Sequence, residues 1–347
     1  MKRDEHRLKV TLVMPTIRED SLLRWMEEWR EYLESRKEFI ISLILVEDNP
    51  EPTFKIPSLE ISSLTHYSWE DIDRELGEIS WIIPRRSDCV RSYGFYKAWK
   101  EGADIIISID DDCYPLRGER GGCDFLETHV KKLTQPVEVE EEAWVSTLQG
   151  VKPRGLPYFE RKIKRVYKRV VLNHGLWSNV PDLDAPTSLT RSKMEDKEIC
   201  SPDMVVPPGK YFPMCGMNLA WRREVTPLMY FLLMGEDVKG NFWGFDRFGD
   251  IWAGIFSKKI LDYLGFQVSS GKPWVYHHKQ SNVFANLKKE APGIEVNEIL
   301  WKRVEEIRLT GKDFLDCYRE LASTLRMEGE YWERLKKAML RWVELFE

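Results

Sequence analysis

The sequence has no apolar run long enough to cross a membrane. A spanning helix needs about 20 consecutive apolar residues, and polar or charged residues interrupt every apolar stretch of this chain well before that length. The N-terminal segment 1–9 is rich in charge and contains neither an apolar signal core nor a small-residue cleavage site. We therefore expect a cytoplasmic protein without a membrane span.

Cysteine and net positive charge are also scarce. The 6 cysteines are scattered and form no Cys-x-x-Cys pair, which argues against a zinc site and against a disulfide framework. Lysine and arginine number 52 against 57 aspartates and glutamates, so the net charge of −5 provides no basic field for nucleic acid. We expect no nucleic-acid partner.

The chain does contain enough apolar sequence for one large domain, with 43% hydrophobic residues among 347. Its first third alternates between strand-like and helix-like segments. The expected strands cover 8–14, 39–46, 81–83 and 105–110, and the expected helices cover 21–36, 69–76 and 88–101. Such alternation predicts an α/β fold with a half-Rossmann, mostly parallel sheet flanked by helices.

The character of the sequence changes after residue 115. The segment 144–213 is rich in proline, glycine and aspartate, and a short strand is expected at 274–276. Amphipathic helical segments follow near 296–308, 312–326 and 330–345. We predict a nucleotide-binding half (1–115), a sugar- and acceptor-binding half of the same domain (116–290) and a helical tail (291–347). The tail could pack on the core or mediate homo- or hetero-oligomerisation.

Three carboxylates, Asp110, Asp111 and Asp112, directly follow the apolar segment 105–109. In open α/β sheets ligands gather at the carboxyl ends of strands. Alternate residues of an extended segment point the same way, so Asp110 and Asp112 would converge while Asp111 faces elsewhere. A divalent cation bridged by substrate phosphates is the partner that such oxygen ligands select. The alternative is a solvated acidic loop without a function.

Polar residues after the other expected strands are placed to hold a nucleotide. A carboxylate after the second strand can accept from a ribose hydroxyl, and an arginine near a diphosphate can donate two hydrogen bonds. Ordinary turn chemistry is the alternative for each of them. The candidates are Pro15, Thr16, Arg18, Glu47, Asp48 and Arg91.

The second half of the chain contains further candidates. A turn-rich stretch contains His174 and Trp177, and Asn218 follows a similar stretch. One of the adjacent histidines after the strand at 274–276, His277 or His278, would complete the metal site, and Lys279 could face phosphates. Single histidines are usually structural, and aromatic rings more often fill a core than stack on a sugar.

Asp250 stands at the front of an apolar segment, in a cluster with Asp246 and Arg247. It could be a helix cap or an active-site carboxylate, and the sequence leaves these two readings open.

Several of these runs together resemble one family, the reversibly glycosylated polypeptides or UDP-arabinopyranose mutases. The matching runs are 13–18, 108–113, 174–187, 212–220, 252–254 and 286–290. The resemblance implies a glycosyltransferase-A fold and a UDP-sugar bound through Mn2+ (or Mg2+) at Asp110, Asp111 and Asp112. It implies His277 as a further metal ligand and Arg154 as the reversibly glycosylated arginine. Our own hypothesis is that Asp250 is the carboxylate that supports this arginine.

The chain departs from the family pattern in three places. Plant members carry two adjacent acids where this chain has Gly249-Asp250, and Leu156 replaces an aromatic residue after Arg154. An extra stretch lies around 241–245.

By resemblance, the predicted function is a metal-dependent UDP-sugar mutase that interconverts pyranose and furanose forms of a UDP-pentose, with UDP-arabinose as the expected substrate. The alternative enzyme is a glycosyltransferase that uses Asp250 as the base for an external acceptor hydroxyl. The third interpretation is a non-catalytic UDP-sugar-binding subunit of a complex, with the tail as its contact surface.

Overall fold

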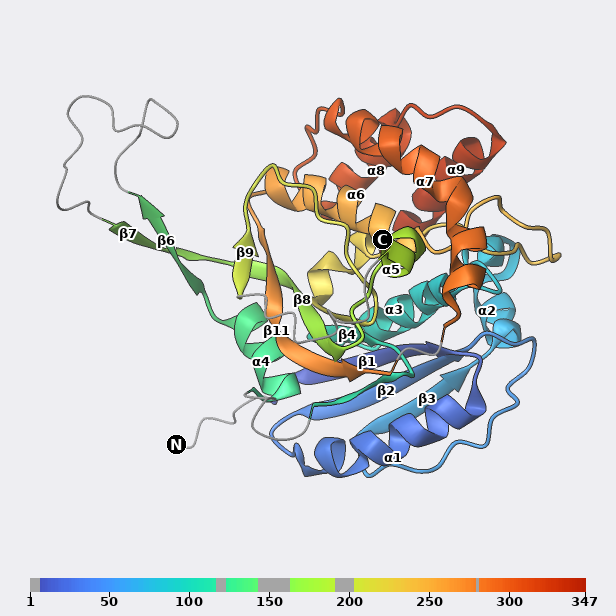
Figure 1. Cartoon of the computed structure of the whole chain (residues 1–347), viewed down its shortest axis with the longest axis vertical. Coiled ribbons are helices and arrows are strands. Elements are labelled where there is room, and N and C mark those ends of the chain that lie inside the picture. Colours follow the sequence, from blue (N-terminus) through green and yellow to red (C-terminus); the bar gives the residue numbers. More distant parts are fainter. Residues whose placement is uncertain (1–6, 117–122, 143–162, 191–202, 279–280) are drawn as a thin grey trace.

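The computed structural model describes residues 7–116, 123–142, 163–190, 203–278 and 281–347. Its centre is a nine-stranded sheet in the order β3-β2-β1-β4-β10-β8-β11-β5, with β9 paired to β11 (Figure 1). The strands are β1 (Lys9–Thr16), β2 (Ile40–Glu47), β3 (Ser63–Tyr67), β4 (Ile105–Ile109), β5 (Cys113–Pro115), β8 (Val170–Asn179), β9 (Met204–Val206), β10 (Asn218–Arg222) and β11 (Gln267–His277).

Most strands of this sheet run in one direction. The ladders β3-β2-β1-β4 are all parallel, and β10 is antiparallel to both β4 and β8. Since β11 is parallel to β8, only β5, β9 and β10 oppose the rest of the described sheet. The predicted α/β fold, with a half-Rossmann, mostly parallel sheet flanked by helices, is confirmed.

Helices cover both faces of the sheet. Below it in Figure 1 lie α1 (Glu19–Ser35) and α4 (Phe125–Thr134), whose buried side chains join one core cluster. On the other face, a second cluster contains side chains of α3 (Arg91–Lys100) and α6 (Gly249–Tyr263). Alternate residues of β1 divide between the two clusters, as expected for a strand buried on both faces.

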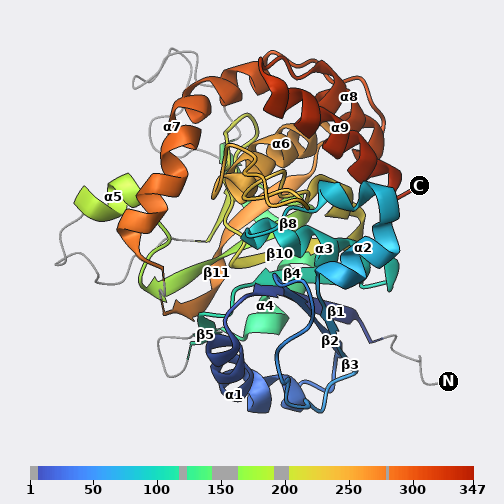
Figure 2. The ribbon, with the colours of Figure 1, turned by 90° about the vertical axis from the view of Figure 1, so that its right-hand side faces the viewer.

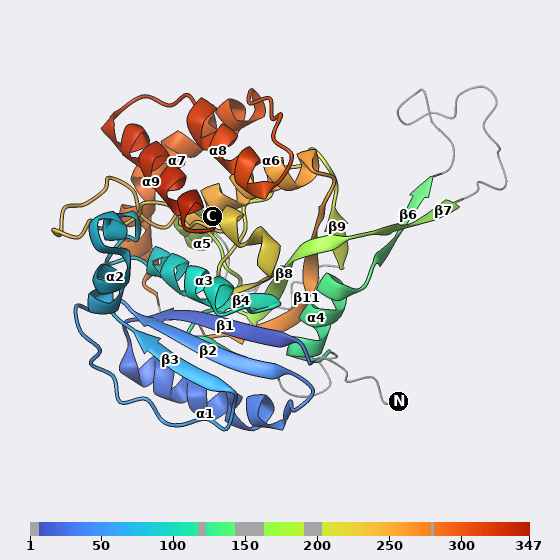
Figure 3. The same ribbon diagram turned by 180° about the vertical axis from the view of Figure 1, so that it is seen from behind.

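One expected strand was wrong. The segment 81–83 belongs to no strand; Gly77–Ile82 forms a 3-10 helix after α2 (Trp69–Leu76), and Ile82 and Ile83 are buried in the core without strand pairing. The third strand of the parallel half is β3, at the sheet edge seen in Figure 3. Its residues are only partly buried, so it has no long apolar run that would mark it in the sequence.

A close contact sets the position of α3. A Cβ atom added at Gly94 would lie 2.4 Å from Cγ1 of Val13 and 2.9 Å from Cγ2 of Val46, so the missing side chain lets α3 lie directly on β1 and β2. This contact places the first turn of α3, which begins at Arg91, beside the carboxyl ends of the strands.

The predicted C-terminal helices are confirmed as α7 (Val283–Glu305), α8 (Phe314–Thr324) and α9 (Glu330–Glu344). The tail packs on the core, which is one of the two arrangements that the sequence left open. Trp342 of α9 stacks on Tyr230 at a centroid distance of 5.2 Å, and its Nε1 donates to the carbonyl oxygen of Pro227 at 2.9 Å. Figure 2 shows α7 arching from α8 toward the short helix α5 (Ala185–Thr190).

The remaining strands, β6 (Val137–Glu142) and β7 (Ile163–Lys168), pair as a separate two-stranded antiparallel ribbon that stands out from the body. Among the described residues, no helix is both long enough and apolar enough to cross a membrane.

Candidate active site

The parallel register brings the predicted residues to one edge of the sheet. Thr16 at the end of β1 pairs with Glu47 at the end of β2, and Val13 of β1 lies opposite Ser108 of β4. The carboxylates that follow β4 therefore emerge beside the end of β1. This edge is the place where ligands collect in open α/β sheets.

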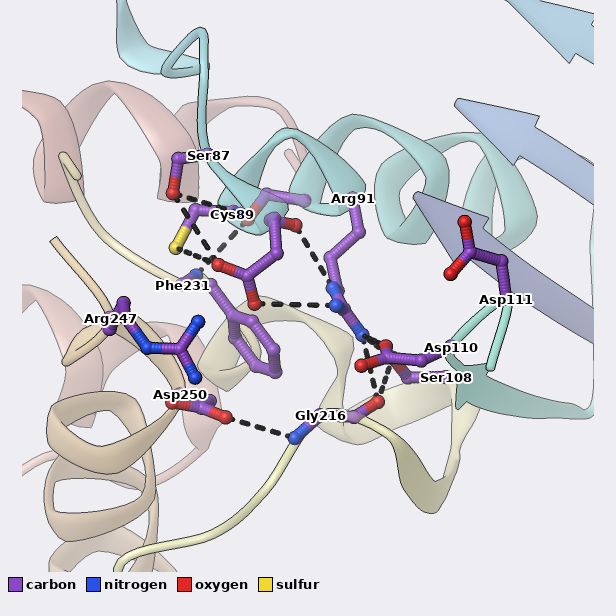
Figure 4. Close-up of polar contacts among 12 residues, drawn as sticks. Ser87, Cys89, Arg91, Ser108, Asp110, Asp111, Gly216, Phe231, Arg247 and Asp250 are labelled. Carbon is purple, nitrogen blue, oxygen red and sulfur yellow. Dashed lines mark hydrogen bonds and ion pairs between the residues drawn. The ribbon is translucent and has the colours of Figure 1, made fainter. Parts of the chain in front are cut away.

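Asp111 is held toward β1. Its Oδ2 accepts a hydrogen bond from Oγ1 of Thr16 at 2.8 Å, and its carboxylate forms an ion pair with Arg18. The close-up in Figure 4 shows the side chains of Asp110 and Asp111 pointing apart, although residues 111–112 form a turn and not the extended segment that the prediction assumed. Asp111 thus anchors the loop after β4 to the end of β1.

Asp112 faces the end of β11. Oδ1 of Asp112 lies 3.9 Å from Nε2 of His277, and the backbone N–H of His278 donates to the carbonyl oxygen of Asp112 at 2.9 Å. Nδ1 of His277 lies 2.7 Å from the carbonyl oxygen of Val180. A carbonyl can only accept, so Nδ1 carries a proton, and in the neutral imidazole Nε2 is then the nitrogen that can bind a metal. Burial raises the pKa of Asp112 to about 6, a shift that Asp110 increases.

Arg91 lies beneath these carboxylates and is only 1% exposed. Its Nη1 donates to Oγ of Ser108 at 2.9 Å and to the carbonyl oxygen of Gly216 at 2.8 Å, and lies 2.8 Å from Oδ1 of Asp110. Its Nη2 pairs with Asp88 at 3.3 Å (Figure 4). These internal partners take up its donors, so Arg91 braces Asp110 rather than presenting a free fork to a diphosphate.

Asp250 lies in the first turn of α6, where Phe248 and not Asp250 occupies the N-cap position. Asp250 is therefore not the N-cap residue of α6. Its Oδ2 accepts from the backbone N–H of Gly216 at 3.1 Å, which ties it to the carbonyl that Arg91 also binds. Burial, together with the carboxylates of Asp88 and Asp182, raises the pKa of Asp250 to about 7.

The substitution at Gly249 has a structural reason. A Cβ atom there would lie 2.3 Å from both Sγ of Cys89 and the carbonyl oxygen of Phe231. An acid at this position would need both neighbours to move, so the chain holds a single acid, Asp250, at the start of α6.

Three charged residues of this region, Asp88, Asp182 and Arg247, were not among the predicted site residues. Asp88 precedes α3 and keeps 45% of its side chain exposed, although the charges of Arg91 and Arg247 lie close to it. Asp182 adds to the negative potential at Asp250. Each of the three lies close in sequence to a predicted segment or site residue. No pattern in the sequence around them indicates that they come together in space.

Two predicted residues after β2 have partners within the protein. Glu47 is 0% exposed and binds Nε2 of His66 at 2.7 Å and Nδ2 of Asn49 at 2.7 Å. Asp48 accepts from Nε1 of Trp69 at 2.7 Å and from the backbone N–H of Arg86 at 3.1 Å, and burial raises its pKa to about 6. Glu47 therefore organises the loop after β2, and Asp48 fixes the loop that leads to α3.

The predicted residues of the second half lie around β8. His174 is buried, and its ring packs edge-on against those of Trp177 and Phe212. Asn218 is 0% exposed and bonds to His129 at 2.9 Å and to the carbonyl oxygens of Leu176 and Pro273. We interpret Asn218 as part of the framework that holds β8, β10 and β11 together.

Of the other predicted residues, Pro15 is buried at the end of β1, and Arg18 keeps 40% of its side chain exposed. Arg154 and Lys279 lie outside the described residues.

The donor set at the sheet edge fits a hard divalent cation. Two carboxylates, Asp110 and Asp112, and the free Nε2 of His277 are the ligand types that Mn2+ accepts, and carboxylates suit Mg2+. Oδ1 of Asp110 is buried and accepts no well-formed hydrogen bond from the described residues, although Arg91 lies near it. Within the described part of the chain, no three His, Cys, Asp or Glu side chains lie close enough together to hold a metal ion.

Comparison with known proteins extends the sequence resemblance. The chain is 35% identical to UDP-arabinopyranose mutase 1 of Arabidopsis thaliana over 98% of its own length and 92% of that protein. It is 33% identical to UDP-arabinopyranose mutase 1 of Oryza sativa subsp. japonica, over 98% and 90% of the two chains. A solved structure, glucosyl-3-phosphoglycerate synthase of M. tuberculosis, covers 86% of this chain and 80% of its own, at 14% identity and a TM-score of 0.42. The model of the family "Reversibly glycosylated polypeptide" matches residues 5–347, and the chain belongs to this family.

Proposed function

We propose that the protein is a metal-dependent UDP-sugar mutase that interconverts the pyranose and furanose forms of a UDP-pentose, with UDP-arabinose as substrate. The observation that carries this choice is the match, over nearly the whole chain, to plant proteins named UDP-arabinopyranose mutase. The carboxylate-rich edge of the sheet supports it, because the reaction needs a cation for the diphosphate and a group that moves a proton.

Asp110, Asp112 and His277 would hold Mn2+ (or Mg2+). The ion would supply neutralisation of the negative charge that develops on the departing UDP. The ends of β1 and β2, with Thr16 and Arg18, would form the nucleotide side of the site.

Ring exchange defines what Asp250 has to do. The substrate and product both carry UDP at C1, and the C1–O5 bond of one is replaced by a C1–O4 bond in the other. UDP leaves with the electron pair of its bond to C1 and later returns that pair to C1. Meanwhile O4 loses a proton and O5 gains one, so the atoms balance without a redox cofactor. A carboxyl with a pKa of about 7 can both accept and release this proton near neutral pH.

The resemblance adds a covalent step at Arg154, in which the glycosyl group is held on the arginine while UDP is free. A guanidinium stays protonated far above neutral pH, so this step needs a carboxylate nearby and exclusion of water. Asp250 is our candidate for that carboxylate.

The test is conversion of UDP-arabinofuranose by the purified chain with Mn2+, followed by chromatography of the nucleotide sugars. We expect UDP-arabinopyranose to appear, and to be lost in Asp112→Ala. An Arg154→Ala variant that keeps the conversion would remove the covalent arginine but leave the mutase. Failure of the wild-type chain to make the pyranose form would overturn the proposal.

A glycosyltransferase is the second candidate, since Asp250 could equally deprotonate an acceptor hydroxyl. Release of free UDP only when an acceptor is added, without ring exchange, would favour it. Either reaction, ring exchange or glycosyl transfer, catalysed by the isolated chain would exclude a purely non-catalytic subunit.

A further inference from the structure

Arg247 has a backbone conformation that non-glycine residues rarely adopt. It lies just before α6 with φ of 65°, in the left-handed region where a side chain is strained. Such strain persists only where the surroundings enforce it. Here the backbone N–H of Arg247 donates to Oδ1 of Asp246 at 2.9 Å, and Oδ2 of Asp246 pairs with Nζ of Lys289 on α7 at 2.8 Å.

A single anchor orients its guanidinium. Nε of Arg247 donates to Oε1 of Glu290 at 3.1 Å, and the other carboxylate oxygen of Glu290 accepts from the backbone N–H of Ala185 at 2.7 Å. Glu290, on α7, is buried, and it links the side chain of Arg247 to the first residue of α5.

The outer nitrogens of Arg247 remain available. Nη1 and Nη2 make no hydrogen bond to the described residues, and the side chain is 35% exposed. In Figure 4 the guanidinium lies beside Phe231 and Asp250, and the charge of Asp88 interacts with both Arg247 and Arg91. Arg91 differs in this respect, because its Nη1 donates to Ser108 and Gly216 and its outer nitrogens form ion pairs with Asp88 and Asp110.

The charges around Arg247 keep it a cation. Burial lowers the pKa of its guanidinium, but the carboxylates of Asp88 and Glu290 more than offset that effect. A site rich in carboxylates repels an anionic ligand, so a diphosphate needs cationic donors on the side away from the metal ligands as well. Arginine matches phosphate oxygens with two parallel hydrogen bonds.

We propose that Arg247 binds the β-phosphate of the nucleotide through Nη1 and Nη2, and so keeps the departing UDP next to the anomeric carbon. The proposal rests on the proposed function for the identity of the nucleotide. The rival explanation is that Arg247 is only a brace that joins the loop before α6 to α7.

Binding of UDP and UMP separates the two explanations, because only UDP has a β-phosphate. We would titrate both nucleotides into the wild type, Arg247→Gln, Arg247→Lys and Lys289→Met at fixed Mn2+ by calorimetry. The Lys289→Met control removes one positive charge from the same brace but contributes no donor to the proposed contact.

We expect Arg247→Gln to weaken UDP binding about 10- to 100-fold, the effect of losing charged hydrogen bonds, and to leave UMP binding unchanged. Arg247→Lys should fall between, since an ammonium keeps the charge without the fork. Lys289→Met should leave the ratio of UDP to UMP affinity as in the wild type.

Equal losses for UDP and UMP, the same loss in Lys289→Met, or unchanged UDP binding would overturn the inference. The same is true if the wild type binds no UDP. A chain whose UDP binding depends on Arg247 but which performs no ring exchange would refute the mutase alone. Ring exchange with an unaltered UDP to UMP ratio in Arg247→Gln would refute the role of Arg247 alone.

Discussion

Nε2 of His277 lies 3.9 Å from Oδ1 of Asp112, and Nδ1 of the same ring lies 2.7 Å from the carbonyl oxygen of Val180. This spacing brings two ligand atoms of the proposed metal site together from segments more than 160 residues apart in sequence, as their numbers show. The successive aspartates therefore have different neighbours. Asp112 faces the proposed ion, whereas Asp111 faces Thr16 and Arg18.

The first prediction concerns these aspartates. Asp112→Asn should weaken Mn2+ binding at least about tenfold, because a ligand carboxylate becomes a neutral amide. Asp111→Asn should change Mn2+ binding little, since this carboxylate faces Thr16 and Arg18. Electron paramagnetic resonance of free Mn2+ measures both affinities. Equal losses of Mn2+ affinity in both variants would contradict this division.

The second prediction concerns the pH dependence of Asp250→Asn. The folded pKa of about 7 lies above the ordinary value of 3.8, so the wild type binds more protons when folded. The contribution of Asp250 to the free energy of unfolding is therefore most favourable below about pH 4 and declines as the pH rises through 7. Asparagine has no charge to bury, so the melting temperature of the variant should exceed that of the wild type increasingly from pH 4 to pH 7, and the difference should then level off.

The same variant should lose about 10²- to 10⁴-fold in turnover, the usual contribution of a positioned acid or base. Asp20→Asn, at the exposed start of α1, is the control for both measurements and should change neither. A constant difference in melting temperature between Asp250→Asn and wild type across the pH range would show that the pKa of Asp250 is not raised as we describe.

The third prediction concerns Gly249. Gly249→Ala should destabilise the protein by about 1–3 kcal/mol, because overpacking forces neighbouring atoms to shift and the carbonyl oxygen of Phe231 is backbone. Tyr263→Ala, at an exposed position of the same helix, should stay within about 0.5 kcal/mol. Chemical denaturation measures both. A neutral Gly249→Ala would mean that an acid pair could be accommodated here after all.

The fourth prediction concerns the tail. Trp342→Ala should cost about 3–5 kcal/mol of unfolding free energy, as for other buried large side chains, because Trp342 is buried against Tyr230 and Pro227. Arg341→Ala, on the exposed face of α9, should cost less than about 1 kcal/mol. If the two variants were equally stable, the tail would not be part of the core.

The sequence by itself determined the elements whose signals are local. The apolar segment that becomes β4 predicts its own buried strand, and the carboxylates that follow it must lie at the strand end. The amphipathic periodicity of the tail predicts α8 and α9 within a few residues. Periods of 2 and 3.6 residues and the order of strand and turn are properties of neighbouring residues, so no tertiary information is needed to read them.

Only the tertiary structure decided how distant residues divide the work of the site. The sequence makes Glu47 and Arg91 candidates for binding the nucleotide. In the structure both are buried and have partners within the protein. Arg247 keeps its outer donors free, and Asp88 and Asp182 come from separate segments to act on Asp250. Burial and charge depend on which segments pack together, and that packing joins residues whose spacing along the chain contains no signal of their contact.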